Sequence, residues 1–353
     1  MTVDGLQSRE RQFASDNYAG ICPSAWMALE RANHGHVQGY GDDPWTALVS
    51  DRIREIFEID CEVYFVFNGT AANSLALASM CQSYHSILCH EFAHIERDEC
   101  GAPELFSNGS KVILLPGENG RIVHTAIEEA VTRRTDIHYP KPRVVSLTQS
   151  TELGTVYPVA GLLAIHEMAR KHGLRTHMDG ARFANAIAAL NVAPKEITWK
   201  AGVDALCFGG TKNGLSIGEA VVFFDTELAK EFDYRCKQAG QLASKMRFVT
   251  APWLGLLDDD VWIKNARQAN DVAALLAAEL AQIEEIPILF PCEANAVFVD
   301  LPARVIRAMR DLDWRFYNFI GEGGCRLMCA WDSTEEDVHA FVSDLKRVLA
   351  EGQ

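Results

Sequence analysis

Lys212 is the residue whose type and surroundings point most directly to chemistry. It follows an apolar run, Val203 to Phe208, and lies in the loop Gly209-Gly210-Thr211-Lys212-Asn213-Gly214, whose glycines let a bulky ligand approach the backbone. Apolar neighbours lower the pKa of a lysine, and a neutral amine can condense with an aldehyde to form an imine. The ordinary alternative is a lysine in a surface loop, so Lys212 alone does not decide the matter.

Asp179 is a second candidate, because it ends another apolar run, Leu174 to Met178. A carboxylate at the end of a buried strand is costly unless it pairs with a cation. Arg182, across the following turn, is one such partner. A protonated ring nitrogen of a bound cofactor is the other, and this segment alone favours neither.

Gly69 and Thr70 form a third candidate site, between the apolar run Val63 to Phe67 and a helix predicted to begin at Ala71. Backbone N–H groups and the positive end of a helix dipole bind phosphate at such a position, although a simply capped helix has the same sequence. A phosphate site, a cation-pairing carboxylate and an amine, each directly beyond a strand, together favour pyridoxal 5'-phosphate (PLP), whose ring acts as an electron sink.

A zinc site is the alternative suggested by His90-Glu91-Phe92-Ala93-His94, which matches the HExxH pattern of zinc proteases. That pattern needs a sustained helix and a third ligand. Here Ser86 to Cys89 is predicted to end a strand, and residues 95–101 are charged and irregular. We therefore expect no metal, and stacking on a flat cofactor is a better use of His94 than zinc binding; a purely structural histidine remains the alternative.

The elements that must position these residues alternate short apolar runs with helical patterns, which predicts an α/β fold with a mostly parallel sheet and helices on both faces. Ligands of such sheets bind beyond the carboxyl ends of the strands. We therefore expect one crevice to be formed by the residues that come after four predicted strands: Gly69 and Thr70, Thr148 and Gln149, Asp179 and Arg182, and Lys212.

A second, smaller unit is predicted from about residue 257, which divides the chain into residues 1–256 and 257–353. It begins with a long helix, Trp262 to Ile283. The later elements are two strands, a helix between them and a last helix with a capping box: Ala296 to Leu301, Arg326 to Ala330, Ala303 to Asp311, and Ser333-Thr334-Glu335-Glu336.

The composition is that of an ordinary folded protein, with 48% hydrophobic and 23% charged residues among 353. A formal net charge of -15 opposes binding to nucleic acid or to anionic membranes. The first residues lack the apolar run of a signal peptide, so a cytoplasmic location is expected. The ten cysteines form no CxxC pair and are predicted to be reduced and mostly buried.

Six stretches occur in one order along the chain: Phe13-Ala14-Ser15-Asp16-Asn17-Tyr18, Tyr40-Gly41-Asp42-Asp43-Pro44, Asn68-Gly69-Thr70-Ala71-Ala72-Asn73, His94 with Glu99 and Gly101, Met178-Asp179-Gly180-Ala181-Arg182 and Gly209-Gly210-Thr211-Lys212-Asn213-Gly214. Together, from Phe13 to Trp331, they resemble the low-specificity L-threonine aldolases, which are fold-type-I, aspartate-aminotransferase-like PLP enzymes. The resemblance implies a large, mostly parallel seven-stranded sheet and a small C-terminal α/β domain.

The resemblance also implies a role for each matching residue. Lys212 would form the imine with PLP, His94 would stack on its ring, and Asp179 would pair with the ring nitrogen. The remaining cofactor contacts would come from Gly69, Thr70, Ala71, Thr211 and Arg182. The substrate carboxylate would be bound by Ser15, Arg182 and Arg326, and the β-hydroxyl would meet Asp98 and His138.

The reaction that this family performs is the reversible cleavage of a β-hydroxy-α-amino acid into glycine and an aldehyde. The base that removes the β-hydroxyl proton stays open among His94, His138 and a water that they hold. Other PLP lyases that catalyse β-elimination, and a serine hydroxymethyltransferase-like activity, are the alternatives. The resemblance further implies a homo-oligomer, a dimer or tetramer, with the site at a subunit interface and basic residues from 237 to 247 near a neighbour's phosphate.

Overall fold

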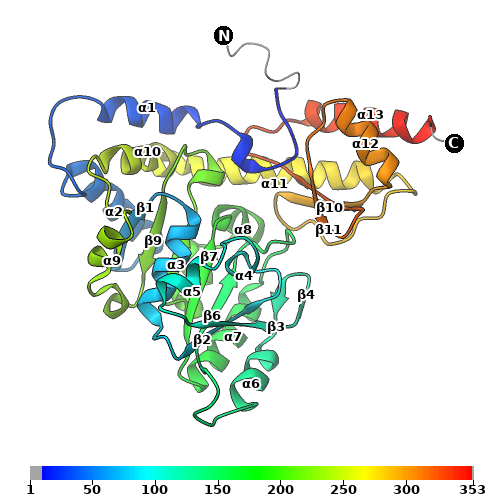
Figure 1. The fold of residues 1–353 in the computed structure, drawn as a ribbon. Coiled ribbons are helices and arrows are strands. Elements are labelled where there is room, and N and C mark those ends of the chain that lie inside the picture. The colour runs from blue at the N-terminus through cyan, green and yellow to red at the C-terminus, as the bar shows by residue number, and fades with distance from the viewer. Residues whose placement is uncertain (1–9, 352–353) are drawn as a thin grey trace.

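Two sheets joined by one long helix organise the chain (Figure 1). The computed structural model describes residues 10–351. A seven-stranded sheet has the order β1-β9-β8-β7-β6-β2-β3, and a three-stranded sheet has the order β10-β12-β11. The helix α11 (Val261–Leu280) runs from the large sheet to the small one along the same side of the molecule as α1 and α10. The α/β fold with seven strands in its main sheet, predicted from the sequence, is confirmed.

The strands are short. Those of the large sheet are β1 (Glu62–Val66), β2 (His85–His90), β3 (Lys111–Leu115), β6 (Lys141–Thr148), β7 (Arg175–Gly180), β8 (Ala205–Phe208) and β9 (Glu219–Phe223). Those of the small sheet are β10 (Ala296–Asp300), β11 (Tyr317–Ile320) and β12 (Gly324–Met328). A separate two-stranded ribbon consists of β4 (Gly117–Glu118) and β5 (Arg121–Ile122).

In the large sheet, β9 is antiparallel to both of its neighbours, β1 and β8. Every other pairing in this sheet is parallel. Two successive reversals cancel, so β1 runs in the same direction as β8. The carboxyl ends of β1, β6, β7 and β8 therefore lie at one edge of the sheet, as the sequence predicted.

The helices of the first part of the chain are α1 (Pro23–Ala32), α2 (Pro44–Phe57), α3 (Gly69–Met80), α4 (His94–Arg97), α5 (Ala102–Phe106), α6 (His124–Thr132), α7 (Val159–Lys171), α8 (Phe183–Leu190), α9 (Phe232–Gln238) and α10 (Arg247–Leu257). Two more come after α11, namely α12 (Ala303–Asp311) and α13 (Glu335–Ala350). The 3₁₀ turns are η1 (Asp16–Tyr18), η2 (Pro194–Ile197), η3 (Trp199–Ala201), η4 (Thr211–Asn213), η5 (Thr226–Ala229) and η6 (Asp258–Asp260).

Side-chain caps determine where two of the helices begin. The Asn68 side chain accepts a hydrogen bond from the Ala71 backbone N–H at 2.9 Å, so α3 begins at Gly69 and not at Ala71. The predicted capping box of α13 is wrong by one position. Thr334 and Asp337 form it, because the Ser333 hydroxyl instead accepts the backbone N–H of Ala330.

Both faces of the large sheet are buried. Neighbouring residues of a strand point to opposite faces, so Val145 packs with helix residues such as Ile165 of α7, while Val144 packs in a second core that contains Leu75 of α3. This explains why consecutive positions such as Val144 and Val145 in the middle of β6 are both apolar.

A separate core lies between the small sheet, α11 and α13, and the N-terminal segment takes part in it. Phe13 is 1% exposed, and its ring stacks on that of Trp314 with 5.8 Å between the ring centroids. The Phe13 carbonyl accepts the backbone N–H of Met328 at 2.8 Å. The residues that precede the large sheet are thus anchored on the small one.

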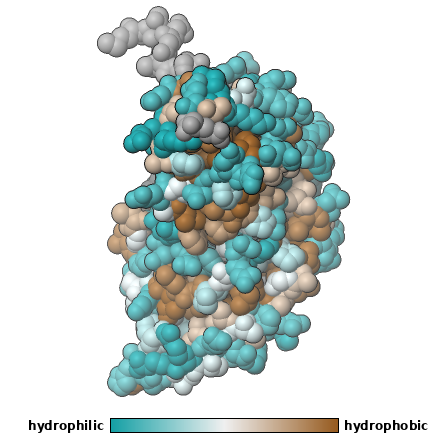
Figure 2. Space-filling model, turned by 90° about the vertical axis from the view of Figure 1, so that its right-hand side faces the viewer, coloured by the Kyte–Doolittle hydropathy of each residue, from teal (hydrophilic) through white to brown (hydrophobic). Residues whose placement is uncertain are grey.

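Hydrophilic and apolar areas alternate on the side of the molecule shown in Figure 2. In the described part of the chain, none of the helices combines the length and the apolar character needed to cross a membrane.

The crossing of α1 and α10 gives a prediction about stability. A Cβ at Gly255 would lie 2.1 Å from the Ser24 carbonyl oxygen, so Gly255→Ala must push the two helices apart. We expect a loss of about 1–3 kcal/mol in the free energy of unfolding, measured by urea titration. Gly161→Ala in α7 is the control, because its Cβ would meet only Pro158 at 3.5 Å; it should gain about 0.5–1 kcal/mol. Equal effects of the two substitutions would contradict this account.

Candidate active site

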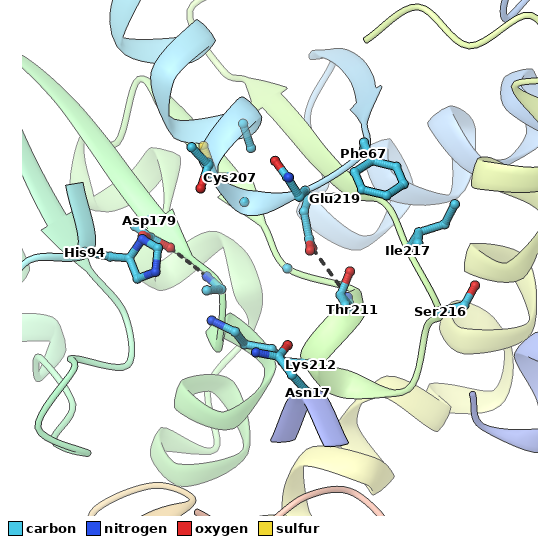
Figure 3. Close-up of a pocket in the computed structure, with 16 residues that line it drawn as sticks. Asn17, Phe67, His94, Asp179, Cys207, Thr211, Lys212, Ser216, Ile217 and Glu219 are labelled. Atoms are coloured by element: carbon cyan, nitrogen blue, oxygen red, sulfur yellow. Dashed lines mark hydrogen bonds between the residues drawn. The ribbon is translucent and has the colours of Figure 1, made fainter. Parts of the chain in front are cut away.

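A cavity of about 320 Å³ lies at the carboxyl edge of the large sheet (Figure 3). It brings together half of the predicted site residues, which come from four separate segments: Gly69 and Thr70, His94, Asp179, and Thr211 with Lys212. Thr148, Gln149 and Arg182, which were also expected in the crevice, do not line it. The lining also includes residues that the sequence did not single out, among them Asn17, Cys207, Ile217 and Glu219. The expected crevice beyond the strand ends is therefore present.

Lys212 lies in η4, directly after β8, and its side chain extends toward the part of the cavity where His94 and Asp179 lie (Figure 3). The loop before it is held from β9, since the Glu219 carboxylate accepts the Gly210 N–H at 2.6 Å. Burial, followed by the charge of Arg182, lowers the pKa of Lys212. Its amine is therefore easier to deprotonate than that of an exposed lysine, as imine formation requires.

Asp179 lies at the end of β7 and is 4% exposed. Its two oxygens accept the Ala181 N–H at 2.9 Å and the Asn73 side-chain amide at 2.8 Å. Burial raises the pKa of Asp179, but the charges of His94 and Lys212 and these hydrogen bonds outweigh burial and lower it. The carboxylate is therefore an anion at neutral pH, ready to pair with a cationic ring nitrogen.

His94 is held at two points by carboxylates. The Nδ1 atom of its ring lies 2.8 Å from Glu99 Oε1, and its backbone N–H donates to Glu152 at 2.8 Å. The Asn73 amide donates to both Glu99 and Asp179, so one side chain links the carboxylates beside the ring. Burial lowers the pKa of His94, but the hydrogen bond to Glu99 and the charge of Asp179 outweigh it and raise the pKa.

The HExxH match does not lie on a helix. His90 is the last residue of β2, and α4 begins only at His94. The two imidazoles therefore do not share one helical face, as the zinc-protease arrangement requires. His90 is used locally, because its Nδ1 accepts the backbone N–H of Phe92 at 3.1 Å.

The N-terminus of α3 opens onto the cavity through Gly69 and Thr70. A Cβ at Gly69 would meet no atom within 4 Å, so the space beside it is free. Ala71, predicted to contact the phosphate, does not line the cavity, and its N–H donates to the Asn68 side chain. The first two residues of the helix are thus the ones that offer an anion site here.

These observations fit PLP. The cavity combines a helix N-terminus for a phosphate, a buried amine for an aldehyde and a buried carboxylate for a ring nitrogen. The chemistry of this donor set matches the three ends of that cofactor.

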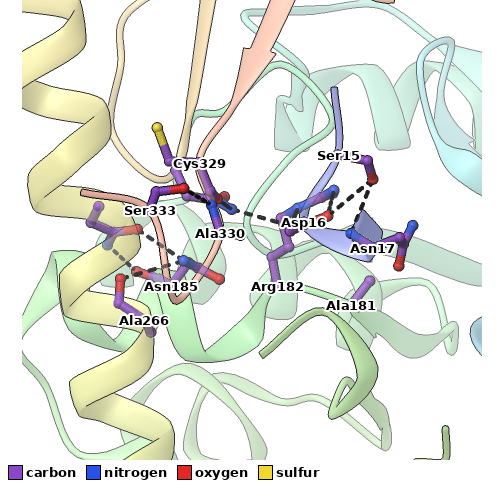
Figure 4. A network of polar contacts seen from close by, with 12 residues as sticks. Ser15, Asp16, Asn17, Ala181, Arg182, Asn185, Ala266, Cys329, Ala330 and Ser333 are labelled. Atoms are coloured by element: carbon purple, nitrogen blue, oxygen red, sulfur yellow. Dashed lines mark hydrogen bonds and ion pairs between the residues drawn. The ribbon is translucent and has the colours of Figure 1, made fainter. Parts of the chain in front are cut away.

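Arg182 and Asp16 form a buried ion pair beside the cavity (Figure 4). The Arg182 Nε and Nη2 atoms donate to the two carboxylate oxygens of Asp16 at 2.6 and 2.9 Å. The Asn295 amide donates to the same carboxylate at 3.1 Å. Arg182 therefore pairs with Asp16, and the local Asp179 to Arg182 pair considered from the sequence does not form. The Ser15 hydroxyl in the same network accepts the Asn17 N–H at 3.2 Å.

Arg326, on β12, differs from Arg182 because no carboxylate within the described part of the chain forms an ion pair with it. Its Nε atom is buried and has no hydrogen-bond partner within residues 10–351. Burial, followed by the charge of Arg182, lowers its pKa to about 10, so it is still a cation at neutral pH. The charges of Asp16, Tyr317 and Asp98 oppose this lowering, and Asp98 itself caps the end of α4. A partly buried guanidinium of this kind is suited to bind a carboxylate.

The structure does not bring His138 to the cavity. His138 is exposed and precedes β6, whereas the cavity lies beyond the other end of that strand. The turn after β6 instead contains Glu152, whose Oε1 also accepts the Thr148 hydroxyl at 2.8 Å. Sequence reasoning named this turn but missed Glu152. It also missed Asn73, although Asn73 lies four residues after Gly69 and therefore on the same side of α3.

The comparisons with known proteins agree on one family. A family model described as beta-eliminating lyase matches residues 12–304. The low specificity L-threonine aldolase of Pseudomonas aeruginosa is 58% identical over 344 residues, which are 98% of this chain and 99% of that protein. The enzyme of the same name from Pseudomonas sp. (strain NCIMB 10558) is 56% identical over 345 residues, which are 98% of this chain and all of that protein.

A solved structure gives the same result at the level of the fold. Threonine aldolase of Leishmania major has a TM-score of 0.90 at 28% identity and covers 96% of this chain and 99% of its own. Enzymes of this family depend on PLP, the cofactor that the cavity fits. The full-length matches and the site geometry therefore identify the chain as a lyase that belongs to the PLP-dependent, fold-type-I family of low-specificity L-threonine aldolases.

Proposed function

We propose that the protein cleaves L-β-hydroxy-α-amino acids, such as L-threonine, L-allo-threonine and L-phenylserine, reversibly to glycine and an aldehyde. The observation that carries this proposal is a buried amine, Lys212, in one cavity with the buried anion Asp179. The unpaired cation Arg326 offers a site for an amino-acid carboxylate. The names of the two Pseudomonas relatives support the same reaction.

PLP, when bound, supplies an electron sink for the pair of electrons released when the Cα–Cβ bond breaks. The residues proposed to hold it are Gly69 and Thr70 at the phosphate, His94 on the ring, Asp179 at the ring nitrogen and Lys212 at the aldehyde. Thr211 lines the same cavity. Arg182 is proposed to help orient the site through its ion pair with Asp16.

Arg326, with Ser15 and Arg182, is proposed to bind the substrate carboxylate and so to fix the orientation of the bond that breaks. His94 and Asp98 are proposed to meet the β-hydroxyl. Glu99 already engages Nδ1 of His94, which leaves Nε2 as the atom that can accept or return a proton. The base is therefore His94 or a water that it holds, because His138 of the same chain lies beyond the far end of β6.

β-Elimination is the second candidate, because the matching family model is described as beta-eliminating lyase. Product analysis separates the candidates. Glycine and an aldehyde from threonine support the aldolase, and a 2-oxo acid with ammonia supports elimination. A requirement for folate would instead indicate a serine hydroxymethyltransferase-like activity. The same aldehyde assay with threo and erythro forms of aliphatic and aromatic substrates gives the preferred side chain and configuration.

We also propose a homo-oligomer, a dimer or tetramer, with the site at a subunit interface. Phe67 lines the cavity yet is 55% exposed, and Trp26 and Tyr40 are also more than half exposed. Lys237 lies over the ring of Tyr40, 4.7 Å from its centroid, and belongs to the basic segment proposed to approach a neighbour's phosphate. We also propose that Lys212 carries PLP as a Schiff base.

A cytoplasmic location is proposed as well. It is supported by the ten free cysteines, most of which are buried.

Replacement of Lys212 tests the assignment of the amine. Lys212→Ala should reduce aldehyde release from L-threonine by at least about 10³-fold, because the only group proposed to form the imine is gone. Lys200→Ala, at an exposed lysine paired with Glu196, is the control and should keep full activity. Borohydride should fix the cofactor covalently to the parent chain but not to Lys212→Ala, as measured by intact mass. Full turnover by Lys212→Ala would falsify the proposed role.

The carboxyl of Glu152 gives a prediction about pH. Burial, followed by the charge of Asp179, raises its pKa to about 7 from an ordinary value near 4.5. The folded protein therefore keeps a proton that the unfolded chain releases, so this group's contribution to stability is present below pH 4.5 and is lost as the pH rises through 7.

Glu152→Gln should abolish this loss of stability above pH 4.5, because the amide does not ionise. The amide oxygen can still accept the His94 N–H. Relative to the parent protein, the variant should gain about 1–3 kcal/mol in the free energy of unfolding between pH 5 and pH 8. Urea titrations of both proteins across this range measure the difference. Parallel pH profiles would show that Glu152 is ionised throughout.

A further inference from the structure

The guanidinium of Arg326 lies against two aromatic rings. Its central carbon is 5.5 Å from the ring centroid of Tyr317 and 5.0 Å from that of Phe319. Both rings belong to β11, the strand next to β12 in the small sheet. The cation is thus contacted by π-systems where Arg182 is contacted by a carboxylate.

The pairing of the two strands explains how both rings reach the same cation. Tyr317 is directly opposite Arg326 in the antiparallel ladder, and opposite residues project from the same face of a sheet. The register then shifts between Asn318 and Ile320, so Phe319 lies in an irregularity of the strand. Such a bulge redirects a side chain, and here it places a second ring beside the guanidinium.

The chemistry of the rings determines what Arg326 can still do. A carboxylate partner would offset the charge and occupy N–H donors, as Asp16 does for the Nε and Nη2 donors of Arg182. An aromatic face attracts the cation but accepts none of these donors in their plane. The guanidinium is therefore held in place while its edge stays available for a planar anion.

The N-terminal segment reaches this arrangement as well. The hydroxyl of Tyr18 lies 3.2 Å from that of Tyr317, and Tyr18 ends the turn η1, which begins at Asp16. One short segment therefore contacts both arginines, Arg182 through Asp16 and Arg326 through the ring of Tyr317.

We propose that Tyr317 and Phe319 are positioning residues for the substrate carboxylate: they hold Arg326 stacked and unneutralised, and Tyr18 fixes the ring of Tyr317. The proposal rests on the proposed function to the extent that the ligand is an α-amino acid. It concerns how the carboxylate site is kept charged and oriented, and it assigns no proton transfer to either ring.

The test uses the holoenzyme and two ligands that differ only where Arg326 acts. Glycine carries the amine and the carboxylate, whereas ethanolamine carries the amine with a hydroxymethyl group in place of the carboxylate. Calorimetry gives a Kd for each, and aldehyde release gives KM and kcat for L-threonine. The variants are Tyr317→Leu, Phe319→Leu, the conservative Tyr317→Phe, and Arg326→Leu as the reference for complete loss of the cation.

We expect Tyr317→Leu and Phe319→Leu each to raise the Kd of glycine and the KM of threonine by about three- to thirtyfold. The Kd of ethanolamine should change by less than about twofold, and kcat should fall less than kcat/KM. Tyr317→Phe keeps the ring and loses only the contact with Tyr18, so it should recover most of the glycine affinity. Tyr84→Leu is the matched control, since it removes an exposed ring that contacts His85 edge-on before β2, at the other end of the sheet, and should bind both ligands as the parent does.

The outcomes separate this proposal from the proposed function. If Arg326→Leu weakens glycine binding but neither leucine variant does, the stack has no positioning role and the aldolase assignment stands. If both ligands weaken together in the leucine variants, the rings support the site as a whole and the proposal is overturned. If Arg326→Leu leaves glycine binding unchanged, the carboxylate binds elsewhere, and both the stack and the proposed substrate geometry are wrong. The absorption spectrum of the bound cofactor and a urea midpoint confirm that each variant is folded.

Discussion

The site depends on keeping the Asp179 carboxylate charged although almost no water reaches it. Burial alone would favour its neutral form, and a neutral acid could not attract a cationic ring nitrogen. The opposing influences are local: the Ala181 N–H, the Asn73 amide and the charges of His94 and Lys212. Asn73 is the shared element, since its two amide hydrogens serve Asp179 and Glu99 together. The orientation of His94 and the ionisation of Asp179 are therefore not independent.

Arg182 and Arg326 are stabilised in two different ways, although both are largely removed from water. A buried guanidinium needs compensation, and Arg182 obtains it from Asp16, whose own carboxylate also receives the Asn295 amide. Arg326 contacts aromatic surface instead, and the carboxylates of Asp16 and Asp98 act on it only through their charge, with no ion pair to either within residues 10–351. The ion pair fixes the position of Arg182, whereas the aromatic contacts leave the N–H donors of Arg326 available for an anion.

The sequence predicted the parts of the site that depend on strand order. Gly69, Thr70, Asp179 and Lys212 each lie at or directly after the end of a strand, and strands that run in one direction bring their carboxyl ends to one edge of the sheet. It did not predict features that depend on three-dimensional partners. The family resemblance assigned Ala71 to the phosphate, and the sequence did not show that its N–H donates to the Asn68 side chain. The division of the chain at residue 257 stays a prediction, and Phe13, far before it, lies in the small-sheet core.

His138 and Glu152 lie at opposite ends of β6, and their positions relative to the cavity also depend on the three-dimensional structure. The family resemblance assigned His138 to the substrate's β-hydroxyl, but within this chain it precedes β6 and lies at the edge of the sheet away from the cavity. Glu152 lies after the strand, in a turn that was already expected to matter. Its significance comes from its contact with the backbone of His94, fifty-eight residues away in sequence, which no local pattern reveals.

The anchoring of Phe13 on Met328 has a consequence for how the enzyme is made. The turn that holds Arg182 begins three residues after Phe13, whereas the strand that receives Phe13 and contributes Arg326 is among the last to be synthesised. A nascent chain that has completed the large sheet therefore already carries Lys212, Asp179 and the start of α3, but it still lacks Arg326 and the two rings beside it. In the order of synthesis, the residues proposed to hold the cofactor therefore precede Arg326, which is proposed to bind the substrate carboxylate.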